Sequence, residues 1–162
     1  MPPPDQEIYR LAHQVGERLG RLGRQLAVAE SCTGGLLGGA LTDVPGSSAY
    51  FLGGVISYAD RVKVEQLQVP QETLRRHGAV SEETAAAMAS GVKALLGADI
   101  GVSITGVAGP AAEGSKPVGL TYIGIAAQTV STHRFQWTGD RWDNRRRSVI
   151  AALELLVQAL EH

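Results

Sequence analysis

The order of apolar segments along this chain predicts an α/β fold: a three-layer α/β/α sandwich with a mixed, mostly parallel sheet. Short apolar runs rich in branched and small residues alternate with longer segments whose apolar residues recur every three or four positions. Two of the runs end in glycine-rich turns, SCTGG at 31–35 and GVAGP at 106–110. Two late runs are joined only by a polar turn, which adds a hairpin to an otherwise parallel sheet.

Each predicted element has its own signal. The first helix is amphipathic from Ile8 to Leu22, and Ser81 is a typical N-cap for the alanine-rich helix that follows it. The other predicted helices are 36–44, 59–68, 70–78 and a last one that starts at 141. The predicted strands are 26–29, 52–58, 98–105, 119–128 and 132–138.

Size and composition favour a single domain over 1–162 that binds small molecules. Fifteen Lys and Arg against sixteen Asp and Glu give a net charge of −1, so no overall field attracts nucleic acid or an acidic membrane. The one cysteine forms no internal disulfide, and the start of the chain does not resemble a signal peptide. We expect a soluble cytoplasmic protein. The apolar face of the last helix favours a homo-oligomer.

The candidate nucleophiles follow the first strand. Loops after parallel strands meet at one edge of a sheet, so the segments after Ala29, Tyr58 and Thr105 should converge. Ser31 and Cys32 then lie before a helix, where free N–H groups and the helix dipole suit developing negative charge. A serine here is often only a helix cap, and a lone cysteine is more often a small buried apolar residue, which is the interpretation we favour for Cys32.

Lysine is the candidate base. No Ser-His-Asp arrangement or Gly-x-Ser-x-Gly turn is evident, and Lys63 lies five residues after Tyr58, just past a strand end. Burial or a cation such as Arg61 or Arg145 would have to lower its pKa. The alternatives are a solvated lysine on a helix face and a half-buried strand tyrosine.

Phosphate and metal signals are weaker. Gly106 to Pro110 is not a P-loop. Arg141 and Arg145 share one helix face and suit a phosphate or carboxylate, although a surface arginine cluster looks the same. The aspartates lack a metal-ligand spacing, so we expect no metal.

Four segments, taken in order, resemble the CinA C-terminal domain family, which also occurs alone as a nicotinamide-nucleotide amidase. They cover nearly the whole chain: AESCTGG at 29–35, GSSAYFLGGVISYADRVK at 46–63, HGAVSEETAAAMASG at 77–91, and TGVAGP, KPVG and GDR between 105 and 141. The resemblance implies a three-layer α/β fold, no metal or other cofactor, and hydrolysis of nicotinamide mononucleotide to nicotinate mononucleotide and ammonia in pyridine nucleotide salvage. The larger relatives carry a further N-terminal domain, and we expect the stand-alone form.

The resemblance also implies roles for individual residues. The catalytic serine, tyrosine and lysine of the family fall on Ser31, Tyr58 and Lys63. Its binding loops fall on Thr33, Gly34, Gly35, Ser48, Thr105, Gly106 and Arg145. Lys63, directly or through Tyr58, would deprotonate Ser31; the N–H groups of 32–35 would hold the oxyanion, and Arg145 with the Thr105 loop would hold the phosphate.

Two other functions stay open. The chain has Ala59-Asp60 and Ala111-Ala112-Glu113 where family members often have Ser-Asn and a glycine run. An acid so near Lys63 would favour its charged form, which suits a non-catalytic module that binds pyridine nucleotides or a competence- or damage-associated partner. A hydrolase of a different small amide is the third possibility.

Overall fold

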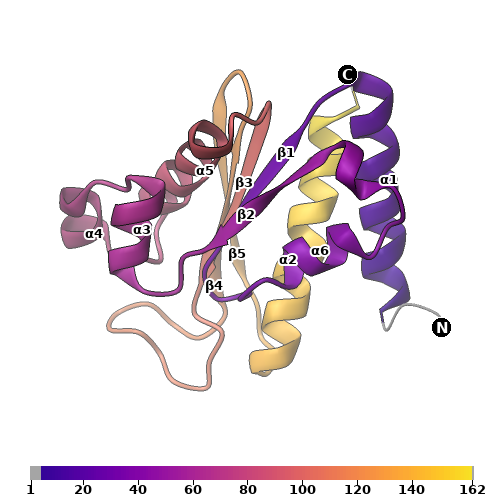
Figure 1. Ribbon diagram of the computed structural model, residues 1–162. Helices are drawn as coiled ribbons and strands as arrows, with labels where there is room; N and C mark the ends of the chain where they lie inside the picture. Colours follow the sequence, from indigo (N-terminus) through magenta and orange to yellow (C-terminus); the bar gives the residue numbers. More distant parts are fainter. Residues whose placement is uncertain (1–4, 162) are drawn as a thin grey trace.

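The computed structural model describes residues 5–161, and in that part six α-helices and five strands form three layers (Figure 1). The strands make one sheet in the order β2-β1-β3-β4-β5. β2, β1 and β3 are parallel neighbours, whereas β4 is antiparallel to both β3 and β5. The sheet is therefore mixed, with only β4 reversed among the described strands, and the predicted fold class is confirmed.

The elements follow the predicted order closely. The helices are α1 (Gln6–Leu22), α2 (Leu36–Thr42), α3 (Asp60–Leu67), α4 (Gln71–His77), α5 (Glu82–Leu96) and α6 (Arg141–Ala159), with a 3-10 turn η1 (Ser47–Ala49). The strands are β1 (Leu26–Glu30), β2 (Phe51–Ile56), β3 (Ile100–Gly106), β4 (Leu120–Ala126) and β5 (Val130–Gln136). The clearest difference is that β5 begins at Val130 instead of 132, because the turn before it takes only residues 127–129.

The two faces of the sheet carry side chains of different size. One face, here called the bulky face, packs against α1, α2 and α6, to the right of the sheet in Figure 1. Its strand side chains include Leu26, Val28, Val102, Ile104, Ile123 and Ile125. The opposite face, here called the small-residue face, lies against α5 and presents Ala27, Ala29, Gly101, Ser103 and Gly124.

Helix α5 lies so close to the small-residue face that backbone touches backbone. A Cβ added at Gly101 would overlap the carbonyl oxygen of Ala89, and one added at Gly124 would overlap that of Ala85. At the other side of α5, a Cβ at Gly91 would overlap the carbonyl oxygen of Leu67 at the end of α3. Because α5 is fixed to the sheet, α3 is fixed through α5.

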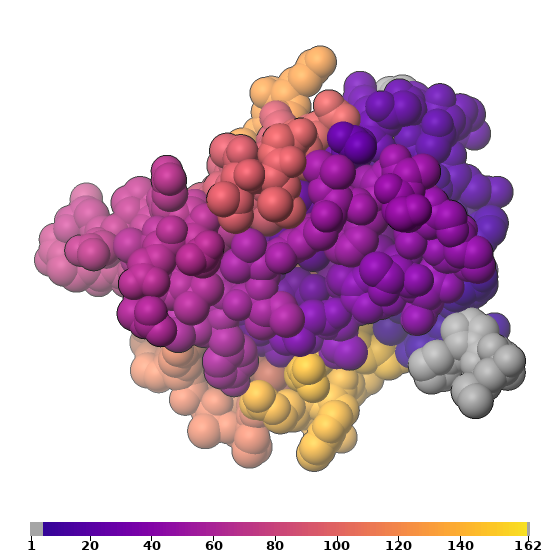
Figure 2. Space-filling model, in the orientation of Figure 1, coloured from indigo at the N-terminus to yellow at the C-terminus, as the bar shows by residue number. Residues whose placement is uncertain are grey.

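Strand β2 is at the edge of the sheet and faces the viewer in Figure 1. In the space-filling view from the same side, β2 and the segments before and after it make up much of the front surface (Figure 2). The loop that joins β3 to β4 projects from the lower edge of the sheet in Figure 1, on the side of α3 and α5. The candidate site lies at this lower end of the strands, not along the edge strand β2.

Candidate active site

A pocket of ≈ 220 Å³, here called the inner pocket, lies at the carboxyl ends of the parallel strands. Its walls come from the segments after β1 and β2, from the end of β3 and the segment after it, from the connection between α4 and α5, and from the start of α6. The residues used below are Ser31, Cys32, Tyr58, Asp60, Lys63, Thr105, Gly106, Glu113 and Arg141. The three loops predicted to converge do meet here.

Ser31 and Lys63 are in direct contact. The Ser31 N–H donates to the carbonyl oxygen of Ile104 in β3 at 2.9 Å, which fixes the first residue after β1 against the neighbouring strand. The Lys63 side chain is 1% exposed, and its Nζ lies 3.0 Å from Ser31 Oγ. The same Nζ donates to the carbonyl oxygens of Ser57 at 2.6 Å and Tyr58 at 3.3 Å. In a neutral amine the two carbonyls would take both N–H groups, which leaves the lone pair for the serine hydroxyl.

Burial lowers the pKa of Lys63, because an ammonium group loses its hydration inside the protein. The negative charges of Asp60 and Glu113 act in the opposite direction but are outweighed. Arg61, one of the two cations predicted to lower the pKa, is exposed and forms an ion pair with Glu65 at 3.1 Å. The cause of the shift is therefore desolvation and not a neighbouring arginine.

Cys32 is a neutral, buried thiol. Burial raises its pKa to about 12, and its side chain packs in the core of the bulky face. A thiol with such a pKa has almost no thiolate near neutral pH, and the thiolate is the nucleophilic form. The interpretation of Cys32 as a small apolar residue thus agrees with its surroundings.

The Glu30 side chain accepts hydrogen bonds from the backbone at the start of α2, the helix after Ser31. Its carboxylate is 2% exposed and accepts from the N–H groups of Gly35, Leu37 and Gly38 at 3.2, 3.0 and 2.9 Å. The prediction that free donors gather at this helix start is therefore wrong for these positions, since the chain supplies its own anion there. The Gly34 N–H donates to the Ser31 carbonyl oxygen at 3.1 Å.

Two donors of the predicted oxyanion site stay open. In residues 5–161, the N–H groups of Cys32 and Thr33 have no hydrogen-bond acceptor on another residue. The Oγ1 atom of Thr33 is fully buried and likewise has no partner within that range. An acidic residue directly before the serine was the sequence signal for the Glu30 contact.

Tyr58 reaches the site through its backbone. Tyr58 is 63% exposed, and its hydroxyl accepts from Arg141 Nη2 at 3.4 Å. In the described part of the chain, that hydroxyl has no hydrogen bond to Ser31 or Lys63. The geometry therefore offers a direct Lys63–Ser31 proton transfer in place of a relay through the Tyr58 ring.

The two arginines of α6 lie in different hollows. Arg141 lines the inner pocket and donates to the Gly109 carbonyl oxygen at 2.6 Å. Arg145 donates to the carbonyl oxygens of Cys32 at 3.0 Å and Thr33 at 3.2 Å. It lines a separate hollow of ≈ 450 Å³ together with Gly34 and Gly35. The predicted binding residues Gly34, Gly35 and Arg145 therefore do not line the inner pocket. Arg141, which the sequence singled out only by its spacing, does line it.

The other predicted binding residues divide in the same way. Thr105 and Gly106 line the inner pocket, and Thr105 Oγ1 donates to the Ala79 carbonyl oxygen at 2.7 Å. Ser48 lies in η1, before β2. Tyr50, which follows η1, accepts from the N–H of Leu26 at the amino end of β1. Within one copy of the chain, Ser48 therefore lies at the amino ends of β1 and β2, whereas Ser31 lies at their carboxyl ends.

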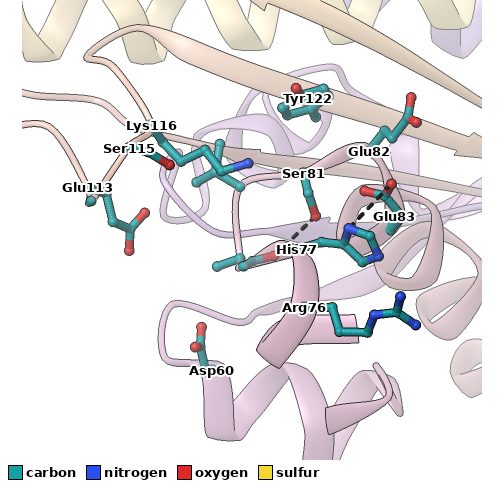
Figure 3. Close-up of a pocket in the computed structure, with 14 residues that line it drawn as sticks. Asp60, Arg76, His77, Ser81, Glu82, Glu83, Glu113, Ser115, Lys116 and Tyr122 are labelled. Carbon is teal, nitrogen blue, oxygen red and sulfur yellow. Dashed lines mark hydrogen bonds and ion pairs between the residues drawn. The ribbon is translucent and has the colours of Figure 1, made fainter. Parts of the chain in front are cut away.

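A larger pocket of ≈ 660 Å³, here called the outer pocket, adjoins the inner one (Figure 3 shows its lining). The two pockets share Asp60, Ala79, Val80 and Glu113. Arg76 and Lys116 supply the positive charges of the outer pocket, and Glu82 and Glu83 add negative ones.

In residues 5–161, no three His, Cys, Asp or Glu side chains are grouped so that they could hold a metal ion. The helices of the same range include none that is long and apolar enough to span a membrane.

Sequence comparison matches residues 8–160 to the family model described as the CinA C-terminal domain. A competence-damage inducible protein of Halothermothrix orenii is 49% identical over 156 residues, which is 93% of this chain but 37% of the relative. A CinA-like protein of Thermotoga maritima is 48% identical over 139 residues, 34% of its length. The chain thus spans about a third of the length of the curated relatives that it matches.

Solved structures match over all or nearly all of their length. The competence/damage inducible protein CihA of Agrobacterium tumefaciens has a TM-score of 0.95 and 38% identity, with 100% of each chain covered. A competence-damaged protein superfamily member from Escherichia coli has a TM-score of 0.92 and 31% identity, with 98% of this chain and 94% of that one covered. The names of these relatives state no reaction.

Proposed function

This chain belongs to the CinA C-terminal domain family, and on that premise we propose that it is an amidohydrolase with Ser31 as nucleophile and Lys63 as base. We further propose that its substrate is nicotinamide mononucleotide and that its products are nicotinate mononucleotide and ammonia. The observation that carries the proposal is the 3.0 Å contact between Ser31 Oγ and a lysine amine that is 1% exposed. A serine hydroxyl needs a neighbouring base to become a nucleophile, and a desolvated lysine is such a base.

The proposed reaction has two halves. Neutral Lys63 takes the Ser31 proton as Oγ bonds to the carboxamide carbon, and the oxyanion accepts from the N–H groups of Cys32 and Thr33. The resulting Lys63 ammonium gives its proton to the amide nitrogen, the C–N bond breaks, and ammonia leaves an acyl-serine. Water then gives a proton to Lys63 and adds to the acyl carbon, and Ser31 recovers its proton as the acid leaves.

The pockets support a nucleotide amide better than a large substrate. Ligand sites for whole drug-sized molecules usually measure about 300–1,000 Å³, so the inner pocket at ≈ 220 Å³ suits one ring with its amide. The remainder of the nucleotide would extend along Arg141 and into the outer pocket. We propose Arg141 as the phosphate ligand in place of Arg145, because Arg141 lines the inner pocket whereas Arg145 lines the separate hollow and donates to the carbonyl oxygens of Cys32 and Thr33.

The test is ammonia release from nicotinamide mononucleotide by the purified protein, beside Ser31→Ala, Lys63→Ala and Cys32→Ala variants. Release that disappears in the first two variants and persists in the third supports the proposal. Activity that survives in Ser31→Ala but is lost in Cys32→Ala would refute the serine mechanism. Binding without release would indicate the non-catalytic module, and release only from another amide would indicate a different hydrolase.

The Arg141 assignment has its own control. Arg141→Met should raise the KM for the nucleotide about tenfold or more while a small carboxamide without phosphate is cleaved as before. Arg145→Met removes a guanidinium from the same helix face one turn later. It should alter kcat instead, because it releases the carbonyl groups of the Cys32-Thr33 turn.

A further inference from the structure

Two carboxylates stand at the junction of the inner and outer pockets without an ionic partner. Asp60 begins α3 and Glu113 lies in the loop between β3 and β4, and both line both pockets. Figure 3 shows their carboxylates pointing toward the opening between those two segments. In residues 5–161 neither lies within ion-pair distance of a basic side chain, whereas Glu65 on the next turn of α3 is paired with Arg61.

These charges oppose the chemistry proposed for Lys63. Both favour the ammonium form of Lys63, although a base must be neutral to take the Ser31 proton. The other polar groups around the amine are the Ser31 hydroxyl, the Cys32 thiol, the carbonyl oxygens of Ser57 and Tyr58, and Arg141 across the pocket. Arg141 in the inner pocket and Arg76 and Lys116 in the outer pocket are the basic side chains that share these pockets with Asp60 and Glu113. None of the three forms an ion pair with either carboxylate in residues 5–161, so both carboxylates remain available to a ligand.

Resting on the proposed function, we infer that Asp60 and Glu113 bind the positively charged ring of an N-substituted nicotinamide. They would thereby select cationic pyridinium amides over neutral amides of the same shape. The ring nitrogen of the nucleotide carries its positive charge close to the carboxamide, so a ring seated over Ser31 brings that charge to the pocket junction. Once bound, the cation offsets the two carboxylates, and Lys63 becomes neutral more readily in the complex than in the free enzyme.

The experiment compares two nucleotides that differ in ring charge. In a Ser31→Ala background, which prevents turnover, dissociation constants are measured for nicotinamide mononucleotide and for its reduced form, which keeps the amide and phosphate but has an uncharged ring. Adding Asp60→Asn and Glu113→Gln should weaken binding of the cation about tenfold and binding of the neutral form less than twofold. Glu65→Gln, which removes an acid from the solvent side of α3, should change neither.

A kinetic measurement checks the effect on the base. The acid limb of kcat reports the substrate complex and that of kcat/KM the free enzyme. In the wild type, the limb for kcat should lie at lower pH than the limb for kcat/KM, and in the Asp60→Asn, Glu113→Gln variant the limb for kcat/KM should move to lower pH, because the two carboxylates no longer favour the ammonium form of Lys63. An equal loss of affinity for both nucleotides, or none for either, would overturn the inference.

The two proposals fail separately. Ammonia release without selection for ring charge would leave the amidase and remove the role of the two acids. Selective binding without ammonia release would keep that role and remove the amidase. If neither nucleotide binds at all, both proposals are wrong.

Discussion

The bulky face and the small-residue face of the sheet belong to the same strands but hold their helices by different means. On the bulky face, Leu, Ile and Val side chains fill the space to α1, α2 and α6. On the small-residue face, glycine and alanine let α5 approach until its carbonyl groups touch the strands. Apolar burial is non-directional, whereas backbone contact fixes a distance. The candidate base is carried on the side where distance is fixed.

The largest expected effect is on activity and comes from the small-residue side. Lys63→Met should lower ammonia release about 10⁴-fold, because the variant keeps the length of the side chain but removes the base. Lys93→Met is the matched control, since Lys93 also donates to a backbone carbonyl oxygen, that of Ala127 at 2.6 Å, but outside the inner pocket. A Lys63→Met protein with a tenth of wild-type turnover would contradict the assignment.

The next effect is on stability and comes from the bulky face. Leu153 of α6 is fully buried in that core, so Leu153→Ala should lower the free energy of unfolding by about 4 kcal/mol, measured by urea titration. The activity of the molecules that remain folded should be nearly unchanged, because the cavity opens on the side away from Lys63. Glu154→Ala, on the exposed side of α6, serves as control.

Adding one methyl group on the small-residue face should cost slightly less stability but more activity. Gly101→Ala would push against the Ala89 carbonyl oxygen and force α5 from the sheet, at a cost of about 3 kcal/mol. Since α3 rests on α5, the Lys63–Ser31 distance should lengthen and kcat should fall. Gly20→Ala in α1, where a Cβ meets no atom within 4 Å, is the control and should be neutral or stabilising. Unchanged kcat in Gly101→Ala would remove the distinction between the faces.

The smallest effect is the pH dependence that buried Lys63 gives to stability. Its folded pKa is below the ordinary value of 10.5, so the unfolded chain binds more protons and stability should rise with pH between the two values. The slope is at most about 1.4 kcal/mol per pH unit. The raised pKa of Cys32 makes stability fall with pH above about 9, where the thiol of the unfolded chain ionises. The contribution of Lys63 is therefore measured as the difference in slope between the wild type and Lys63→Met. A slope that is the same in both proteins would show that Lys63 is charged when folded.

The fold could be predicted because each element carries a local signal. Periodicity gave the helices and strands, and the carboxyl-end rule brought Ser31, Lys63 and Thr105 to one edge of the sheet. The individual side-chain contacts could not be predicted in the same way. Arg141 and Arg145 look equivalent on a helix face, yet Arg141 lines the inner pocket whereas Arg145, one turn later in α6, lines a different hollow.

Two further differences have physical reasons that no local pattern contains. A sequence motif does not tell at which end of a strand it lies. Ser48 lies before β2, whereas the residues of this segment that line the inner pocket lie after β2. The donors after Ser31 look free in sequence, but the chain turns back so that the Glu30 carboxylate reaches them. Both depend on the path of the backbone between elements, which propensity and spacing leave open.

The buried Cys32 thiol, next to the candidate nucleophile, has a consequence for chemical resilience. Peroxide and alkylating reagents attack thiolates, and a sulfur with a pKa of about 12 presents almost none to them. A hydroxyl nucleophile has no comparable oxidation products. The one sulfur next to the candidate nucleophile therefore stays protonated and unreactive. Oxidants and thiol reagents that inactivate cysteine hydrolases should leave this site intact.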